Sequence, residues 1–584
     1  MEQKIITPLV YTDKDKCNRC YACVKVCPVK AIRISQNCVE VIPERCIGCG
    51  NCITICSTGA HQYRSSKANL NELKKSGAVL AAIIDPSIPG EFVDISHYSR
   101  FVGMIRQLGF EYVNEISFGA DLVGQKYKEL FASSKDKFYI TANCPAVVKY
   151  VEKYQPELVP NLAPIVTPMV ATAKVVRQMY GDDIKVVAIG PCIAAKDEAL
   201  ATSGQGKVDE VITYQELREL FEENGITEKY VNAREFDAPI GCKGSLFLIS
   251  RGMLQSVDID KDLTSSQVLS TEGTTNFPEA IKQYSSSPTL QRHLDLFSCE
   301  GCVMGPGTSR GGKKFIRRSL VIDYVNRRLK KFDSELWLKH LKKFEPIDLS
   351  RTFKVDDQRL PAPSEEQLRE ILDDLGQDHK GCGSCGYESC MEFAQAISAG
   401  LARKEMCPSY SVRKIKEVNT NLDSTKAALE QSERLAHMGQ LSAGIAHELN
   451  NPLGVVIMYC NILLDECAED SPIREDLELI VSQANRCKKI VGGLLNFARK
   501  NQINTEKTDA LKLIKDSVAA TIIPDNISIK IDNKLANTSI FVDYEQMLQV
   551  FTNIFNKIVD AMLGGGKILV SMEDESQMVA FHVS

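Results

Sequence analysis

The run LAHMGQLSAGIAHELNNPLG at residues 435–454 sets His447 beside Glu448 on an otherwise apolar, helix-forming segment. Its apolar residues recur at steps of three and four, the spacing that puts side chains on one face of a helix. They are Leu435, Met438, Leu441, Ile445 and Leu449. His447 falls off this stripe, and Pro452 follows about one turn later, where a proline kinks a helix. The pattern predicts a helix that packs one face and presents an imidazole on another.

The heptapeptide His-Glu-Leu-Asn-Asn-Pro-Leu at residues 447–453 resembles the phosphoacceptor motif of sensor histidine kinases. The resemblance implies that His447 attacks the γ-phosphate of ATP while Glu448 accepts the imidazole proton. It also implies that Asn451 positions water for the reverse, phosphatase reaction. A response regulator would then be the partner that receives the phosphate. We interpret His437, ten residues earlier, as structural.

Length, charge and cysteine content narrow the class of protein. A chain of 584 residues exceeds what one hydrophobic core serves, so we expect three to five domains. The net charge of -5 gives no sign of nucleic-acid binding, and the sequence shows no apolar run long enough for a membrane span and no signal-peptide core. We therefore expect a cytoplasmic protein. Its 21 cysteines then predict metal ligation rather than disulfides, because the cytoplasm keeps thiols reduced.

The N-terminal region, residues 1–65, contains the spacing C-x2-C-x2-C-x3-C twice. In such runs three thiolates surround one cubane cluster and the fourth ligates the other cluster. The first predicted cluster takes Cys17, Cys20, Cys23 and Cys56, and the second takes Cys46, Cys49, Cys52 and Cys27. Residues 10–65 resemble bacterial two-cluster ferredoxins, which implies electron exchange with a redox partner. Zinc or structural cysteines are the alternative, but zinc sites favour paired knuckles with long spacers.

Between residues 75 and 345, short apolar runs alternate with helical patterns, which favours an α/β domain. Predicted strands include AVLAAIID (78–85), KFYITA (137–142) and KVVAIG (185–190), and residues 168–181 are a predicted helix. Cysteines follow the ends of predicted strands, where α/β folds place their sites. They are Cys144, Cys192, Cys299 and Cys302. Four thiolates from three loops predict one more cubane, with buried structural cysteines as the alternative.

These cysteine loops, together with DPSIPGEF (85–92) and SFGADL (117–122), resemble the catalytic domain of iron-only hydrogenases. The resemblance implies a cubane on the four cysteines, with Cys302 bridging to a diiron subsite. Three positions depart from the family: Asn143 replaces a proton-relaying cysteine, Ala195 a cyanide-binding lysine, and Phe297 a methionine. The pair CEGC also has two residues between its thiols where catalytic members have three. These departures keep the cubane ligands, weaken the diiron pocket and argue against fast hydrogen turnover.

A second cysteine module, residues 365–410, follows the proline-punctuated linker LPAPSEE (360–366). Its predicted ligands are Cys382, Cys385, Cys390 and Cys407. Three close thiolates on a glycine-rich loop, with a fourth beyond a helix, suit a 4Fe-4S cluster better than the alternative of tetrahedral zinc. The module resembles the four-cysteine cluster module of membrane electron-transport complexes and corrinoid iron-sulfur proteins.

Residues 411–434 follow this module with apolar residues at steps of three and four, which predicts a parallel coiled coil. A single surface helix is the alternative. Residues 435–502 predict a helical hairpin whose second helix keeps a heptad pattern from Ile473 onward. Two such hairpins would pair as a four-helix bundle, so we expect a homodimer. A change at the cluster module could then twist the His447 helix.

Residues 508–584 begin like the ATP-binding lobe of histidine kinases, with strands at ISIKID, SIFVD and KILVSM and a helix over 543–562. The resemblance implies that Asn553 holds the Mg²⁺ that bridges the ATP phosphates. Lys557 stands where the family has a second asparagine. The sequence given stops at AFHVS, before the family's Asp-x-Gly-x-Gly loop, so we expect an incomplete ATP pocket in this polypeptide as given.

These patterns together predict a multidomain α/β and α protein. It comprises a two-cluster ferredoxin domain, an α/β hydrogenase-like domain, a small iron-sulfur helical module, a helical hairpin for dimerisation and a partial α/β ATPase lobe. The predicted function is a redox or hydrogen sensor histidine kinase. An iron-only hydrogenase or electron-transfer subunit with a vestigial kinase tail is the alternative, and a module that merely docks a regulator is a third hypothesis.

Overall fold

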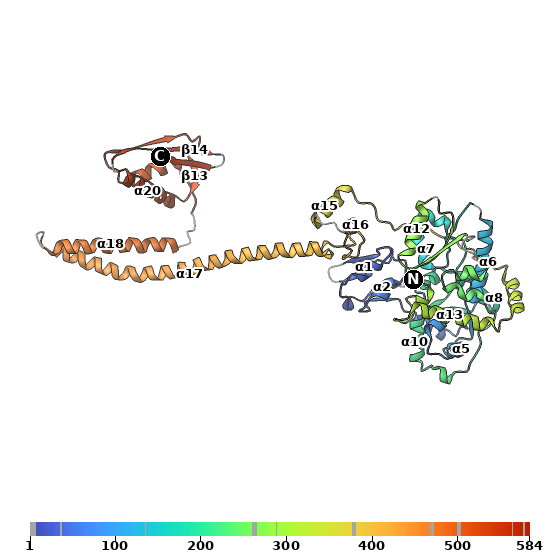
Figure 1. Ribbon diagram of the computed structural model, residues 1–584. Helices are drawn as coiled ribbons and strands as arrows, with labels where there is room; N and C mark the ends of the chain where they lie inside the picture. Colours follow the sequence, from blue (N-terminus) through green and yellow to red (C-terminus); the bar gives the residue numbers. More distant parts are fainter. Residues whose placement is uncertain are drawn as a thin grey trace. The chain divides into compact units, whose positions relative to one another are not determined.

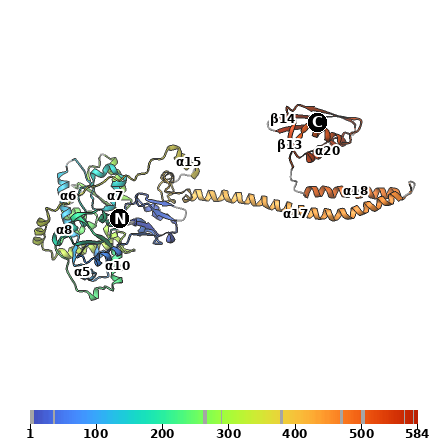
Figure 2. The same ribbon diagram turned by 180° about the vertical axis from the view of Figure 1, so that it is seen from behind.

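A computed structural model describes most of the chain (Figures 1 and 2). The described residues are 7–34, 38–134, 136–259, 266–287, 289–376, 381–466, 468, 472–498, 504–562, 564–575 and 578–584. The chain divides into two compact units, Met1–Lys416 and Glu417–Ser584. No helix in the described ranges is both long enough and apolar enough to cross a bilayer.

The first segment of the N-terminal unit is a small fold of two β-hairpin-like pairs and two short helices. Strand β1 pairs with β4 and β2 with β3, all antiparallel. The elements are β1 (Val10–Thr12), α1 (Ala22–Val26), β2 (Ile32–Ile34), β3 (Val39–Val41), α2 (Asn51–Ile55) and β4 (His61–Tyr63). Both helices end at a cysteine C-cap, Cys27 for α1 and Cys56 for α2.

The backbone of this segment repeats in the same register as its cysteines. Tyr21 and Gly50, which precede the two helices, have φ of 59° and 74°. Lys30 and Gly59, which follow the helices, also lie in the left-handed region. The second repeat uses glycine, which adopts this conformation readily, whereas the first tolerates bulky side chains at some cost. The two halves therefore share one backbone path around their thiols.

A four-stranded parallel sheet forms the centre of the next segment, in the order β6-β5-β7-β8. Its strands are β5 (Leu80–Ile84), β6 (Tyr112–Glu115), β7 (Lys185–Gly190) and β8 (Glu210–Thr213). A second, two-stranded parallel sheet pairs β9 (Val268–Glu272) with β10 (His293–Phe297). The helices are α3 (Lys67–Lys75), α4 (Ile88–Glu91), α5 (Tyr98–Gln107), α6 (Ser117–Ser133), α7 (Pro145–Tyr154), α8 (Pro168–Tyr180), α9 (Ala194–Ala201), α10 (Tyr214–Glu223), α11 (Gly252–Ser256), α12 (Asn276–Ser286), α13 (Lys314–Leu329) and α14 (Ser334–Phe344).

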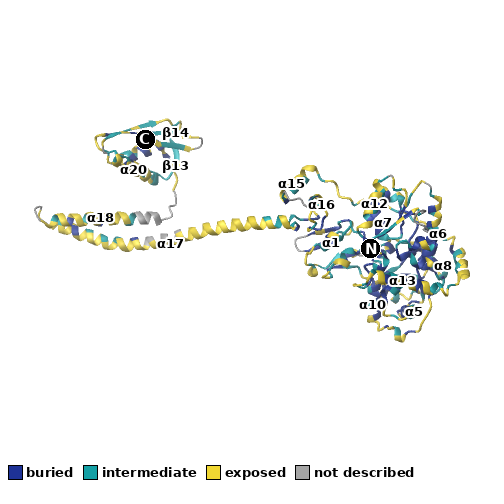
Figure 3. Cartoon of the chain, in the orientation of Figure 1, coloured by how far each residue is buried: buried dark blue, intermediate teal, exposed yellow. Residues whose placement is uncertain are grey.

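The sheet is buried on both faces, as the apolar runs predicted. Residues of α6 and α8 cover one face of β5, and residues of α5 and α10 cover the other. Figure 3 colours much of α6 and α8 as buried. The strands predicted at 78–85 and 185–190 and the helix predicted at 168–181 are confirmed as β5, β7 and α8. The strand predicted at 137–142 is wrong: Ile140 makes only isolated bridges, to Leu162 and Leu294.

The second cysteine module packs on the ferredoxin-like segment rather than standing apart. Its helices are α15 (Glu365–Leu375) and α16 (Cys390–Ser398), followed by the 3-10 turn Lys404–Met406. Phe393 and Leu401 share one core with Val24 and Ile32. Figure 1 shows α16 beside α1, in agreement with this shared core.

The C-terminal unit holds a helical hairpin and an α/β lobe. The hairpin consists of α17 (Pro408–Glu466), which begins directly after Cys407, and α18 (Ile473–Ala498). Helix α17 continues through Pro452. The lobe contains β11 (Glu506–Asp509), α19 (Ala510–Ala519), β12 (Ile527–Asn533), β13 (Ser539–Val542), α20 (Tyr544–Ala561), β14 (Gly566–Glu575) and β15 (Met578–Val583). The predicted strands at ISIKID, SIFVD and KILVSM are confirmed as β12, β13 and β14.

Candidate metal centres and phosphoacceptor helix

Four cysteines from three separate loops of the hydrogenase-like segment line one cavity of about 90 Å³. Cys144 caps α7, Cys192 lies between β7 and α9, and Cys299 and Cys302 follow β10. Cys192 follows β7 of the four-stranded sheet and Cys299 follows β10 of the two-stranded sheet, as the sequence predicted, whereas Cys144 follows a segment that is not a strand.

The environment of this cavity disfavours thiolate charge unless a bound cation compensates it. Burial raises the pKa of all four thiols, to about 12 for Cys192. For Cys192 and Cys299, neighbouring thiols raise the pKa further. Four thiolates can therefore gather here only with compensating positive charge, which the iron of a cluster supplies.

Three residues beside the cysteines differ from those that surround a diiron subsite in the family that this segment resembles. Asn143, Ala195 and Phe297 all line it. Asn143 donates from Nδ2 to the sulfur of Met253 at 3.0 Å, and its Oδ1 is buried without a hydrogen-bond partner among the described residues.

Lys196, one place after Ala195, does not take over the role of the missing lysine. Its ammonium donates to Glu216 at 2.8 Å, to Ser66 Oγ at 2.6 Å and to the carbonyl of Val211 at 3.0 Å. These partners hold the Lys196 side chain among α3, β8 and α10, and Lys196 is not among the residues that line the cysteine cavity.

Several of the ferredoxin-like thiols lie near one another. Burial raises the pKa of Cys49 most. The neighbouring thiols of Cys27, Cys46 and Cys144 raise it further. Burial and neighbouring thiols also raise the pKa of Cys52, and Cys23 is among these neighbours. Burial and then Cys20 and Cys17 raise the pKa of Cys23 to about 12. Cys27, the last cysteine of the first run, thus stands with the thiols of the second. For Cys56, the contact described is with Thr58 Oγ1 at 3.5 Å.

The second ferredoxin set lies next to the cavity of the hydrogenase-like segment. Cys27, Cys46 and Cys49 pack against one apolar core together with Cys144 and Cys192. Hydrogen bonds clamp the two segments together: Tyr154 donates to the carbonyl of Arg45 at 2.7 Å, and Arg310 donates to the carbonyl of Cys56 at 3.1 Å. The thiol groups therefore form a continuous series across this boundary.

The cysteines of the later module also share a cavity, of about 370 Å³, which all four predicted ligands line. They are Cys382, Cys385, Cys390 and Cys407. Within the described residues, no three side chains of cysteine, histidine, aspartate or glutamate are close enough to hold a single metal ion.

The sequence did not indicate that Tyr387, between two of these ligands, belongs to this site. Tyr387 lines the same cavity and is only 3% exposed. The sequence feature that could have indicated this role is the position of an aromatic residue inside the cysteine motif.

The three predicted phosphoacceptor residues, His447, Glu448 and Asn451, are all exposed on α17. Buried positions in the hairpin include Ala446, Leu477 and Ala484. The predicted stripe lies on the outer face of the single chain, since Leu441, Ile445 and Leu449 are 66%, 49% and 45% exposed. The side chains of Leu435 and Met438 lie outside the part of the chain that the structure describes.

Helix α20 contains Asn553, the residue predicted to hold Mg²⁺. Asp543 caps it by accepting from Gln546 N at 3.1 Å and also accepts from Gln546 Nε2 at 3.1 Å. Asn553 is exposed further along the helix, one turn before Lys557, which is exposed as well.

Four regions of the chain match known protein families. Residues 9–57 match the 4Fe-4S dicluster domain, and residues 78–306 match the iron only hydrogenase large subunit, C-terminal domain. Residues 379–409 match a family described as a putative Fe-S cluster, and residues 437–503 match the His Kinase A (phospho-acceptor) domain. The chain thus fuses hydrogenase-like and iron-sulfur segments to a histidine-kinase phosphoacceptor segment.

Relatives of both halves are known. The sensor kinase CckA of Brucella abortus is 32% identical over 142 residues, which cover 24% of this chain and 15% of CckA. The NADP-reducing hydrogenase subunit HndD of Solidesulfovibrio fructosivorans is 26% identical over 315 residues, which cover 44% of this chain and 51% of HndD. A variant of the FeFe-hydrogenase HydA1 from Chlamydomonas reinhardtii aligns at a TM-score of 0.36 with 16% identity, over 48% of this chain and 95% of that one. The chain therefore spans about half the length of HndD and a smaller share of CckA.

Proposed function

We propose that this protein is a cytoplasmic redox sensor in which iron-sulfur clusters control phosphorylation of His447 and transfer of the phosphate to a response-regulator aspartate. The observation that carries the proposal is the continuity of α17, a single helix that begins after Cys407 and includes His447. A reducing compartment suits the protein because its thiol ligands must stay reduced.

Four 4Fe-4S clusters are the cofactors that the thiol sets support. Two belong to the ferredoxin-like segment, one to the hydrogenase-like cavity and one to the module at 382–407. The clusters supply reversible one-electron chemistry, and the protein supplies thiolates, burial and hydrogen bonds that set their potentials. Electrons enter through the ferredoxin-like segment.

A diiron subsite is not part of the proposal. Asn143 cannot relay a proton as a thiol does, and Lys196 is engaged with Glu216. The same residues argue against hydrogen turnover as the function of the chain. Without that subsite, the signal is the redox state of the clusters.

The phosphotransfer step uses residues that α17 presents to solvent. His447 supplies the nucleophilic nitrogen, and the adjacent Glu448 accepts the proton from the other ring nitrogen. Asn451, one turn on, positions a water for dephosphorylation. We propose ATP and Mg²⁺ as the phosphate donor, with Asn553 as a magnesium ligand, and a homodimer as the working assembly.

The test uses full-length, cluster-loaded protein prepared anaerobically, with radiolabelled ATP and a complete histidine-kinase catalytic lobe supplied in trans. We expect label on His447 whose amount differs between oxidised and reduced protein. His447→Gln should abolish the label, and His437→Gln is the matched control that should keep it. Cys390→Ala should remove the redox dependence. Equal labelling in both redox states would sink the sensor function, and no labelling at all would leave only a docking module.

A further inference from the structure

Tyr387 is a buried phenol without a partner. It is 3% exposed, and its hydroxyl oxygen has no hydrogen-bond partner among the described residues. A buried hydroxyl left unpaired costs about 1–3 kcal/mol, so such groups normally have a partner. The ring lines the cavity of Cys382, Cys385, Cys390 and Cys407. The group expected in that cavity contains sulfur atoms that accept hydrogen bonds.

The Tyr387 hydroxyl is a hydrogen-bond donor. A tyrosine phenol ordinarily titrates at about pH 10, so the hydroxyl carries its proton at neutral pH and can donate a hydrogen bond. Cys385 belongs to the module, whereas Cys27 belongs to the second ferredoxin set. Tyr387 packs in one apolar core with both of these cysteines, which come from different segments of the chain.

Several contacts fix the module on the ferredoxin-like segment at this point. The ammonium of Lys30 donates to the carbonyl of Gly386 at 3.1 Å and to that of Val24 at 3.2 Å. The same ammonium lies 5.4 Å from the centroid of the Tyr387 ring. Ile34 N donates to the carbonyl of Leu401 at 3.0 Å. Glycine is favoured at Gly386, because its φ of 90° is rarely adopted by other residues and a Cβ atom there would lie a tight 3.2 Å from Lys25 N and Val24 Cβ.

We propose that the Tyr387 hydroxyl donates a hydrogen bond to a sulfur of the 382–407 cluster and thereby raises the reduction potential of that cluster. The higher potential makes this module the electron acceptor of the ferredoxin-like segment. The step is one electron: the ferredoxin cluster is oxidised, the module cluster is reduced, and no proton moves. An external low-potential electron carrier reduces the ferredoxin cluster again. This inference rests on one part of the proposed function, namely that the module binds a 4Fe-4S cluster.

The test is an EPR-monitored redox titration of the full-length, cluster-loaded protein with dithionite as reductant. Tyr387→Phe removes only the hydroxyl and keeps the packed ring. We expect one cluster to become harder to reduce, with the ratio of reduced to oxidised cluster falling about tenfold at a fixed potential, or ~59 mV for one electron. The signal that shifts should be the one that Cys382→Ala removes.

Tyr410→Phe is the matched control, since Tyr410 belongs to the same apolar core but is only partly buried. A second measurement protects the test: Lys30→Met removes a positive charge beside the ring and should also make the module cluster harder to reduce. An unchanged midpoint potential in Tyr387→Phe, or an equal shift in Tyr410→Phe, would overturn the inference. A shifted potential with redox-independent labelling of His447 would overturn the sensor function and leave this inference standing.

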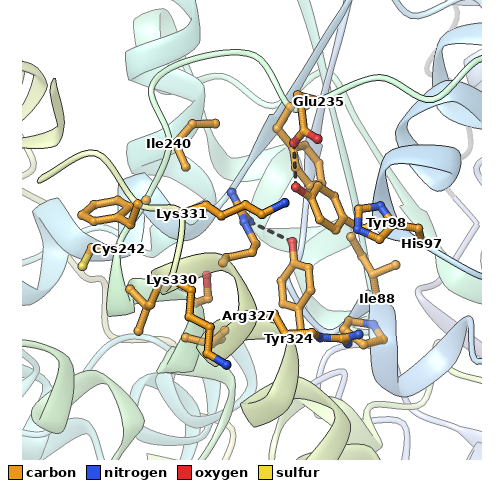
Figure 4. Close-up of a pocket in the computed structure, with 18 of the residues that line it drawn as sticks. Ile88, His97, Tyr98, Glu235, Ile240, Cys242, Tyr324, Arg327, Lys330 and Lys331 are labelled. Carbon is orange, nitrogen blue, oxygen red and sulfur yellow. Dashed lines mark hydrogen bonds between the residues drawn. The ribbon is translucent and has the colours of Figure 1, made fainter.

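An independent observation concerns a second cavity on the hydrogenase-like segment, of about 670 Å³, which Cys242 lines but none of the predicted cluster ligands does (Figure 4). Its floor holds a caged cation: the Arg328 guanidinium lies 5.3 Å, 5.4 Å and 5.6 Å from the ring centroids of Tyr324, Phe236 and Tyr98. Buried Glu115 forms an ion pair with Arg328. Trp337 lies in the wall, where it donates to Asp121 at 2.9 Å.

Unneutralised positive charge lines the rim of this cavity. Neither Lys330 nor Lys331 pairs with a carboxylate among the described residues, and Arg327 donates only to the carbonyl of Asp323, at 3.3 Å. The rim carboxylate of Glu235 already accepts from Tyr98 at 2.7 Å. Lys331 extends across the mouth toward Tyr98 and Glu235 (Figure 4). The cavity is of ligand size, with aromatic walls and a cationic rim.

We infer that this cavity binds a phosphorylated heteroaromatic compound of mononucleotide size. The ring packs among the aromatic walls, and the phosphate pairs with Arg327, Lys330 and Lys331. The chain contains a single tryptophan, Trp337, so its fluorescence reports on this cavity alone.

The test titrates AMP and flavin mononucleotide into cluster-loaded protein, by equilibrium dialysis and by Trp337 fluorescence. The triple variant Arg327→Ala, Lys330→Ala and Lys331→Ala should weaken binding at least about tenfold, or ~1.4 kcal/mol. Lys339→Ala with Lys342→Ala is the control for charge outside the cavity. Binding of neither compound up to ~1 mM, equal binding of adenosine, or binding that survives the triple variant would overturn the inference.

Discussion

Lys196 forms a buried ion pair with Glu216, in which the two side chains are 1% and 4% exposed. Removing one partner of such a pair leaves a buried charge uncompensated, which costs about 3–5 kcal/mol. We expect Lys196→Met to lower the free energy of unfolding by that amount in urea titrations followed by Trp337 fluorescence. Adding Glu216→Gln should recover part of the loss. A loss below about 1 kcal/mol would show that water reaches the pair.

Asp295 makes stability depend on pH. Burial raises its pKa from 3.8 to about 6, against the opposing hydrogen bonds from Thr141 and Ser270. A carboxyl whose pKa rises on folding contributes stability that is complete below its unfolded pKa and is lost as pH rises through its folded pKa. The two-unit rise corresponds to about 3 kcal/mol, lost between about pH 4 and pH 7. Asp295→Asn should flatten this part of the pH profile in urea unfolding, whereas an unchanged slope would assign it to another group.

Individual residues differed in how far the sequence could place them. Asn143 and Ala195 were predicted to stand beside the cysteines, because they are chain neighbours of Cys144 and Cys192. The engagement of Lys196 was not predictable, since its partners Ser66 and Glu216 are far away in the sequence and meet it only through the packing of the sheet. The same holds for Tyr387, whose neighbour Cys27 precedes it by hundreds of residues.

Helix α17 displays an apolar stripe that remains exposed among the described residues of the single chain. Ile415, Val418, Leu422 and Leu429 are each between 57% and 61% exposed. A stripe at coiled-coil spacing gains stability by packing against a second copy. We expect Leu422→Glu with Leu429→Glu to convert a dimer to a monomer in analytical ultracentrifugation, with Lys426→Glu as an off-stripe control. A wild-type monomer would favour the alternative of a single surface helix.

Periodicity identified the elements better than it identified their partners. Strands β5 and β7 and helix α8 follow from runs whose length and pattern leave one interpretation. The run at 137–142 has a similar composition, but Ile140 N bonds to Asn161 and Thr141 N bonds to Leu294, so its hydrogen bonds are divided between two neighbours. The docking of α16 on the ferredoxin-like segment depended on matching apolar surfaces, such as those of Val24 and Phe393, which a linear pattern does not encode.

The complete protein should hold about sixteen irons per chain, four for each thiol set, and no diiron subsite. Infrared spectra after anaerobic maturation, with an iron-only hydrogenase matured in parallel as the positive control, should therefore lack carbonyl and cyanide bands. The physical reason is that Asn143 and Phe297 line the cavity and Lys196 is held by Glu216. Neither a proton-relaying thiol nor a lysine that could donate a hydrogen bond to a cyanide ligand is therefore in place. Cys302→Ser should leave the spectrum unchanged and disturb only the cubane of that cavity. If the bands appear and hydrogen reduces a dye through the protein, hydrogen itself becomes the signal that reaches His447.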